Sequence, residues 1–114
     1  MSLAKRIAAK RAEQERGFLD VAEWGETNEP LRLYFTTVSA RDMEHIQRKH
    51  KDFINNPTMS AMIDMIIRKC EDAEGEKAFT LEDKSILMGE PLNLIAKVFG
   101  AVLESVTVEE HEKN

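Results

Sequence analysis

Hydrophobic residues alternate with polar ones in one part of this chain and recur at helical spacing in most of the rest. The alternation is regular over residues 31–37 and predicts a strand with one buried face, formed by Leu31, Leu33 and Phe35. Residues 18–24 are less regular but rich in strand-forming types. Because the polar loop 25–30 joins these segments, we predict a hairpin over residues 18–37, which needs helices to lie against.

From residue 39 onward, the spacing of the apolar residues is typical of helices. Ser39 predicts the start of a helix over residues 40–51, because a serine hydroxyl caps the free amides of a helix N-terminus. Pro57 predicts the start of the next helix, since proline is favoured at the first helical position. That helix has the most pronounced apolar stripe of the chain, formed by Met59, Met62, Ile63, Ile66, Ile67 and Cys70.

Two further helices are expected toward the C-terminus. Thr80 and Asp83 have the spacing of a capping box and predict a short helix over residues 81–88. Gly89 is expected to end this helix, and Pro91 to open a last helix that runs to residue 104.

The N-terminal segment is predicted to be a separate helical arm. Residues 2–16 are dominated by helix-forming types, and Gly17 is expected to end the helix. Its thin apolar stripe suggests an arm over residues 1–17 that packs lightly on a domain of residues 18–104, with helices over 39–104. Residues 105–114 are expected to form a flexible tail. The fold class is therefore α+β and mostly α: a helical arm, a β-hairpin and a compact bundle of about four helices.

Size and composition fit one small domain. The chain has 114 residues, of which 42% are apolar and 32% charged. Its one cysteine, Cys70, allows no internal disulfide and fits a reducing cytosol. No apolar run approaches the roughly twenty residues of a membrane span, and no secretion signal is apparent. We therefore expect no membrane partner.

Charge is distributed unevenly along the chain. Residues 1–70 contain 12 Lys or Arg and 10 Asp or Glu, a net charge of +2, whereas residues 71–114 contain 4 and 11, a net charge of −7. This pattern lacks the basic stripe of nucleic-acid-binding proteins, so we expect no nucleic-acid partner. A small DNA-binding regulator stays as an alternative that predicts salt-sensitive binding to DNA.

Acidic residues around Gly75 do not have the spacing of a calcium loop. With Gly75 at the sixth position, the first and last ligands would be Cys70 and Leu81, which do not suit calcium. Zinc is no better supported, because His45 and His50 are five residues apart and fall on different faces of a helix. We expect neither a metal nor a cofactor.

Nucleophilic catalysis is not indicated either. Cys70 lies on the apolar stripe of a helix, where a buried thiol is common. The serines have no accompanying elbow or glycine signature, and the five glycines are isolated, so no phosphate-binding loop is present. We therefore expect a protein that is not an enzyme, with no catalytic residues.

Short motifs follow one another along residues 18–104 in a recognisable order. The first strand ends in Glu23-Trp24-Gly25, and the second leads into the helix capped by Ser39. After the central apolar helix come the turn Asp72-Ala-Glu-Gly75 and the helix start Phe79-Thr-Leu-Glu-Asp83. In this order and spacing, they resemble the tail assembly chaperones of long-tailed bacteriophages and prophages. The chain departs from that pattern in its first loop, where a tighter, glycine-rich hairpin is expected, and in its longer N-terminal arm.

The resemblance implies a role in phage tail assembly. Such chaperones coat the long, largely helical tape measure protein, keep it soluble and help recruit tail tube protein subunits. They act in the host bacterial cytoplasm and are not expected in the mature virion. A homo-oligomer is compatible with the sequence.

Aromatic and flexible apolar side chains are the expected contacts to such a client. Thioethers adapt to varied partner helices, although core filling is the competing role for methionine. Met65 falls off the main apolar stripe, and Trp24 is also expected to seal the hairpin against the helices. The expected partner-binding residues are Trp24, Tyr34, Met59, Met62 and Met65.

The alternative function is a generic helical protein-interaction adaptor or regulatory subunit without catalytic activity. Gene order distinguishes the two, because a chaperone of this kind is expected between the genes for the tail tube and the tape measure protein.

Overall fold

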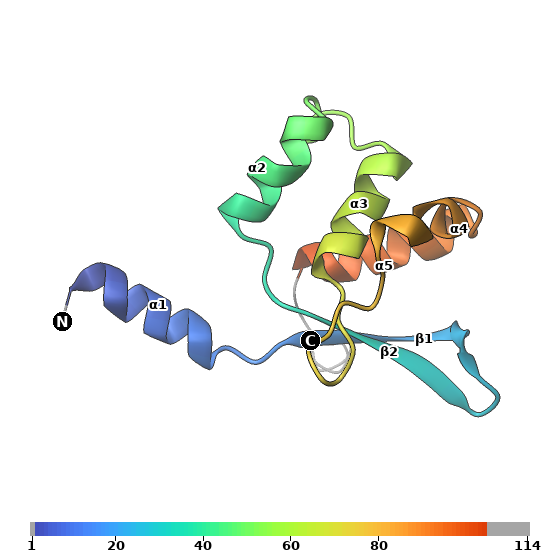
Figure 1. Ribbon diagram of the computed structural model, residues 1–114, viewed down its shortest axis with the longest axis horizontal. Helices are drawn as coiled ribbons and strands as arrows, with labels where there is room; N and C mark the ends of the chain where they lie inside the picture. The colour runs from blue at the N-terminus through green and yellow to red at the C-terminus, as the bar shows by residue number, and fades with distance from the viewer. Residues whose placement is uncertain (1, 105–114) are drawn as a thin grey trace.

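The architecture is that of a computed structural model, which describes residues 2–104 (Figure 1). It confirms the predicted fold class, α+β and mostly α. The expected C-terminal tail, residues 105–114, lies outside the described residues. The elements, in chain order, are helix α1 (Leu3–Glu13), strands β1 (Gly17–Glu26) and β2 (Glu29–Phe35), helices α2 (Ala40–Lys49) and α3 (Met59–Lys69), the 3-10 helix η1 (Leu81–Asp83), and helices α4 (Lys84–Met88) and α5 (Leu92–Glu104).

The hairpin is tighter than the sequence suggested. β1 and β2 pair antiparallel, and the register shifts before Glu26, which pairs with Glu29. Thr27 and Asn28 form the turn, and Asn28 has a φ of 66°, which asparagine tolerates better than most residues. The prediction of a loop over residues 25–30 is therefore wrong, because the polar residues on either side of the turn continue the two strands.

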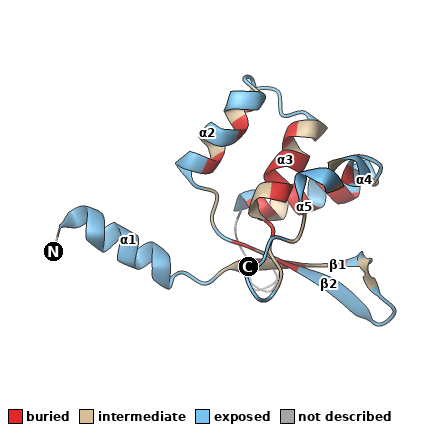
Figure 2. Cartoon of the chain, in the orientation of Figure 1, coloured by how far each residue is buried: buried red, intermediate tan, exposed pale blue. Residues whose placement is uncertain are grey.

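Helix α3 lies at the centre of the molecule. It packs against α2, α4 and α5, and α5 also packs against β1. In Figure 2 the buried residues follow α3, α5 and the nearest part of the hairpin. The predicted alternation holds at the hairpin base, where the buried residues are Leu19, Val21, Leu33 and Phe35. Toward the hairpin tip, Leu31 is 37% exposed, although Val21, its cross-strand partner, is 1% exposed.

Helix α1 stands apart from the bundle (Figure 1). None of its residues is buried, and Leu3 and Ile7 are 67% and 59% exposed. Gln14 is its C-cap, and Gly17 is the first residue of β1. The prediction that Gly17 ends this helix is therefore wrong.

Side-chain caps begin the helices of the bundle. The start predicted at Pro57 is wrong by two residues, because the Thr58 side chain provides the cap of α3. The predicted helix over 81–88 begins as the 3-10 turn η1 before α4. No helix within residues 2–104 has the length and apolar character needed to cross a membrane. The predicted cap at Ser39 and the predicted capping box of Thr80 with Asp83 are both present, and Ser39 also forms a capping box with Asp42.

Candidate partner-binding surfaces

Trp24 attaches the hairpin to the helices. Its half-buried ring meets Phe79 edge-on, with ring centroids 5.9 Å apart. Its indole Nε1 donates a hydrogen bond to the carboxylate of Glu90, just before α5. The expectation that Trp24 seals the contact between hairpin and helices is confirmed.

Trp24 and Tyr34 line the same concave surface. It has a volume of about 490 Å³ and lies between the hairpin and the turn at residues 72–74. Its apolar lining consists of Trp24, Pro30, Leu31, Tyr34 and Ala73. Its charged lining consists of Glu26, Glu29, Asp72, Glu74 and Arg32. We call this surface the hairpin hollow. It brings together two of the residues expected to bind a partner, and its charged lining is mostly acidic.

The Asp72–Gly75 motif is a self-contained turn beside the hairpin hollow. The Asp72 carboxylate accepts hydrogen bonds from the amides of Glu74 and Glu76, each at 2.9 Å. Gly75 has a φ of 86°, a conformation that glycine adopts without strain. One carboxylate oxygen of Asp72 therefore accepts two backbone hydrogen bonds and stabilises the turn.

Arg16 holds this turn against the hairpin. Its guanidinium donates to the Glu71 carboxylate at 2.9 Å and to the carbonyl oxygens of Asp72 and Ala73 at 3.0 and 3.1 Å. The same guanidinium lies 4.4 Å from the ring centroid of Tyr34, within the range of a cation–π contact. Tyr34 and Glu71 also exchange two backbone hydrogen bonds, at 2.9 and 2.8 Å. One wall of the hollow is therefore firmly fixed.

The three methionines of α3 do not line the hairpin hollow. Met59 and Met62 are half-buried and pack against the core. Met65 is fully buried. The expectation that Met65 lies off the buried stripe is wrong, because α2, α4 and α5 all pack against α3. Met65 therefore has no exposed surface to offer a partner.

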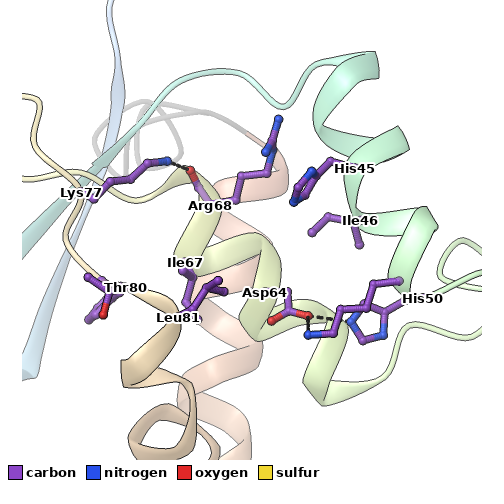
Figure 3. Close-up of a pocket in the computed structure, with 11 residues that line it drawn as sticks. His45, Ile46, His50, Asp64, Ile67, Arg68, Lys77, Thr80 and Leu81 are labelled. Atoms are coloured by element: carbon purple, nitrogen blue, oxygen red, sulfur yellow. Dashed lines mark hydrogen bonds and ion pairs between the residues drawn. The ribbon is translucent and has the colours of Figure 1, made fainter.

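A second concave surface, which sequence reasoning missed, lies between α2 and residues 77–81, beside α3 (Figure 3). It has a volume of about 420 Å³. Its apolar lining consists of Ile46, Ile67, Phe79 and Leu81. Its basic lining consists of His45, Lys49, His50, Arg68 and Lys77. We call this surface the α2–α3 groove.

Among the described residues that line the α2–α3 groove, Asp64 is the single acid. His50 Nε2 lies 2.7 Å from its Oδ2, and Lys49 Nζ lies 3.4 Å from the same atom (Figure 3). Its Oδ1 accepts no regularly oriented hydrogen bond, but Lys84 Nζ is 2.9 Å away. Burial alone would raise the pKa of Asp64, but Lys84 and His50 outweigh burial and lower this pKa. The charge of Asp64 is thus balanced within the protein.

The sequence did contain a signal for this pairing. Asp64 interrupts the most apolar helix of the chain, and an aspartate in such a place is rarely buried without a partner. The sequence does not reveal which bases would pair with it.

Another buried carboxylate ties α2 to α3 near the other end of α2. Asp42 accepts hydrogen bonds from Arg68 Nε and the Ser39 amide, each at 2.8 Å, and lies 2.8 Å from Lys69 Nζ. Burial alone would raise the pKa of Asp42, but Lys69, Ser39 and Arg68 hold this pKa well below its usual range. The two helices are therefore joined on both sides of Ile46.

Cys70, the one thiol of the chain, is buried in the core. Burial raises the pKa of the Cys70 thiol to about 12, so the thiol is protonated at neutral pH. Within residues 2–104, no group of three or more His, Cys, Asp or Glu side chains is placed to hold a metal ion.

Comparison with known proteins relates the chain to others by its fold. No protein-family model and no curated protein sequence matches it. Among solved structures, it is similar to the tail assembly chaperone of bacteriophage HK97, with a TM-score of 0.57 and 10% sequence identity. The alignment covers 90% of this chain and 95% of the HK97 protein. At this identity the similarity is one of fold, and this chain has a fold like that of a phage tail chaperone.

Proposed function

We propose that this protein is a phage tail assembly chaperone, which binds the tape measure protein, keeps it soluble and helps recruit tail tube subunits. The observation that carries the proposal is the similarity in fold to the HK97 tail assembly chaperone along 90% of this chain. The order of motifs along residues 18–104 supports the same function. Action in the host cytoplasm and absence from the mature virion belong to the same proposal.

The hairpin hollow has the chemistry of a surface for an amphipathic client. Trp24, Leu31 and Tyr34 present apolar area beside four carboxylates. An amphipathic helix can bury its apolar stripe on such a surface. The carboxylates favour client segments that have Lys or Arg beside that stripe. Half-buried Met59 and Met62 remain candidate contacts for the client at the start of α3, whereas Met65 is fully buried and is no longer a candidate.

Leu31→Ser tests the hairpin hollow without disturbing the core. Leu31 is already 37% exposed, and we expect its loss to weaken capture of the tape measure protein about tenfold, as for a residue worth about 1.4 kcal/mol of binding. Leu92→Ser is the matched control, because Leu92 is 67% exposed and does not line the hollow. The measurement is co-purification of co-expressed tape measure protein, with circular dichroism to verify folding.

Two negative results have different meanings in this experiment. Undiminished capture by folded Leu31→Ser and Trp24→Ala variants would remove the hairpin hollow from the client site. A tape measure protein that stays insoluble beside the wild-type chain would overturn the proposed function itself. Gene order provides an independent test, since a gene far from any tail genes would favour a generic adaptor.

A further inference from the structure

The α2–α3 groove is basic in a protein whose net charge is −5. Lys49, Arg68 and Lys77 line it against one carboxylate, that of Asp64. Lys49 shares Asp64 with Lys84, and Arg68 pairs with Asp42; Lys84 and Asp42 do not line the groove. The hairpin hollow, by contrast, has four carboxylates and one arginine in its lining. Two concave surfaces of one small domain therefore have opposite charge, and the groove is the one that attracts anionic groups.

The inner surface of the α2–α3 groove is apolar. Ile46 and Ile67 are 2% and 6% exposed, and half-buried Phe79 lies beside them. Leu81 also lines the groove and is 74% exposed, although a large apolar side chain gains free energy when it is covered. A free anion or a phosphate backbone would satisfy the basic residues but leave this apolar surface uncovered.

We infer that the α2–α3 groove binds an acidic segment of a partner protein, in which a large apolar side chain lies beside Asp or Glu residues. The apolar side chain covers Phe79 and Leu81, while the neighbouring carboxylates meet Lys49, Arg68 and Lys77. The volume of about 420 Å³ is within the range of protein pockets that enclose a ligand group. This inference goes beyond the proposed function, because it concerns a different surface and a partner segment of opposite charge.

Titration with a synthetic peptide tests the inference on the full chain. The probe is a fluorescein-labelled helix-forming peptide of about 15 residues, with leucines flanked by glutamates. We expect saturable binding by fluorescence anisotropy. A peptide with lysines in place of the glutamates, and one with alanines in place of the leucines, should each bind at least about tenfold more weakly.

Two variants of the protein, each with a matched control, assign the binding to the groove. Leu81→Ser and Lys49→Glu should each weaken binding of the acidic peptide about fivefold to tenfold. Leu92→Ser and Lys51→Glu make the same changes at exposed positions outside the groove and should leave binding unchanged. Circular dichroism verifies that all four variants fold.

Other occupants of the groove give distinct results. Oligo(dT) and phosphatidylglycerol vesicles are tested in parallel; binding of either that Lys49→Glu abolishes and Leu81→Ser does not would assign the groove to phosphate. Dissociation of a homo-oligomer by Lys49→Glu, with peptide binding intact, would assign it to a second copy of this chain. Either result would overturn the inference, as would equal binding of the acidic and basic peptides. All of these results leave the tape measure experiment on Leu31 unaffected.

Discussion

Asp42 combines a local and a tertiary role in one carboxylate. Three residues after Ser39, it completes the capping box at the start of α2. The same side chain accepts a hydrogen bond from Arg68 and lies 2.8 Å from Lys69, both near the end of α3. Burial disfavours the charged carboxylate, and these partners offset that cost.

Asp42→Asn should lower the free energy of unfolding by about 3 kcal/mol at neutral pH, because Lys69 and Arg68 lose a buried partner. The pKa of Asp42 is lower in the folded chain than in the unfolded chain. Its stabilising effect is therefore complete above the unfolded pKa of about 3.9, and is lost as the pH falls through the folded pKa. Urea unfolding of both proteins should show a stability difference that shrinks below about pH 4.

Glu44→Gln is the control for the Asp42 experiment. It removes an exposed carboxylate of the same helix, paired with Arg48 at 3.0 Å, and should cost less than about 0.5 kcal/mol. If the free energies of unfolding of wild type and Asp42→Asn differed by the same amount from neutral to acidic pH, the carboxylate charge would not be what stabilises the fold.

At the scale of the element, the hairpin depends on a close backbone approach at Gly25. A β-carbon there would lie 2.2 Å from the Glu29 carbonyl oxygen and 2.6 Å from both the Leu31 nitrogen and the Pro30 Cα. Gly25 falls within the stretch where the strand register shifts. This close approach therefore explains why the third position of the Glu-Trp-Gly motif is a glycine in this chain.

Gly25→Ala should destabilise the protein by about 1–3 kcal/mol, because backbone atoms would have to move to admit the methyl group. Gly100→Ala is the opposite case: apart from the neighbouring residues and backbone of α5 itself, no atom lies within 4 Å of the added β-carbon, so alanine should stabilise the helix by about 0.5–1 kcal/mol. Thermal unfolding followed by circular dichroism measures both effects. An unchanged Tm for Gly25→Ala would contradict the close backbone approach at Gly25.

At the scale of the whole molecule, stabilising contacts are concentrated around α3. The extents of 48 × 36 × 29 Å reflect a compact helical bundle from which α1 and the hairpin tip project in opposite directions (Figure 1). The residues of α3 from Ile63 to Ile67 are all buried, whereas α1 has no buried residue. Local stability should therefore fall steeply from the bundle to the arm.

Hydrogen exchange followed by mass spectrometry tests this gradient. Amides of α1 should exchange with less than about tenfold protection, because an isolated helix of 11 residues is marginal in water. Amides of α3 and α5 should exchange only on global unfolding. Protection of α1 similar to that of α3 would mean that the arm is covered by another molecule in solution.

Local patterns in the sequence determined which elements this protein has. The alternation over residues 31–37, the cap at Ser39, the capping pair of Thr80 and Asp83, and the apolar stripe after Pro57 all predicted the right element, because each depends on residues only a few positions apart. The same locality explains the errors at Gly17 and Pro57, where neighbouring residues, Gln14 and Thr58, are the caps instead. A local sequence pattern does not determine which of several nearby residues caps the helix.

The tertiary structure alone decided which surfaces the protein exposes. Met65 is buried because three other helices pack against α3, and periodicity within α3 cannot report this packing. The α2–α3 groove and the pairing of Asp64 with His50 and Lys84 join segments that are distant along the chain. Such contacts depend on how finished elements pack together, so the partner-binding surfaces emerge only when the chain has folded.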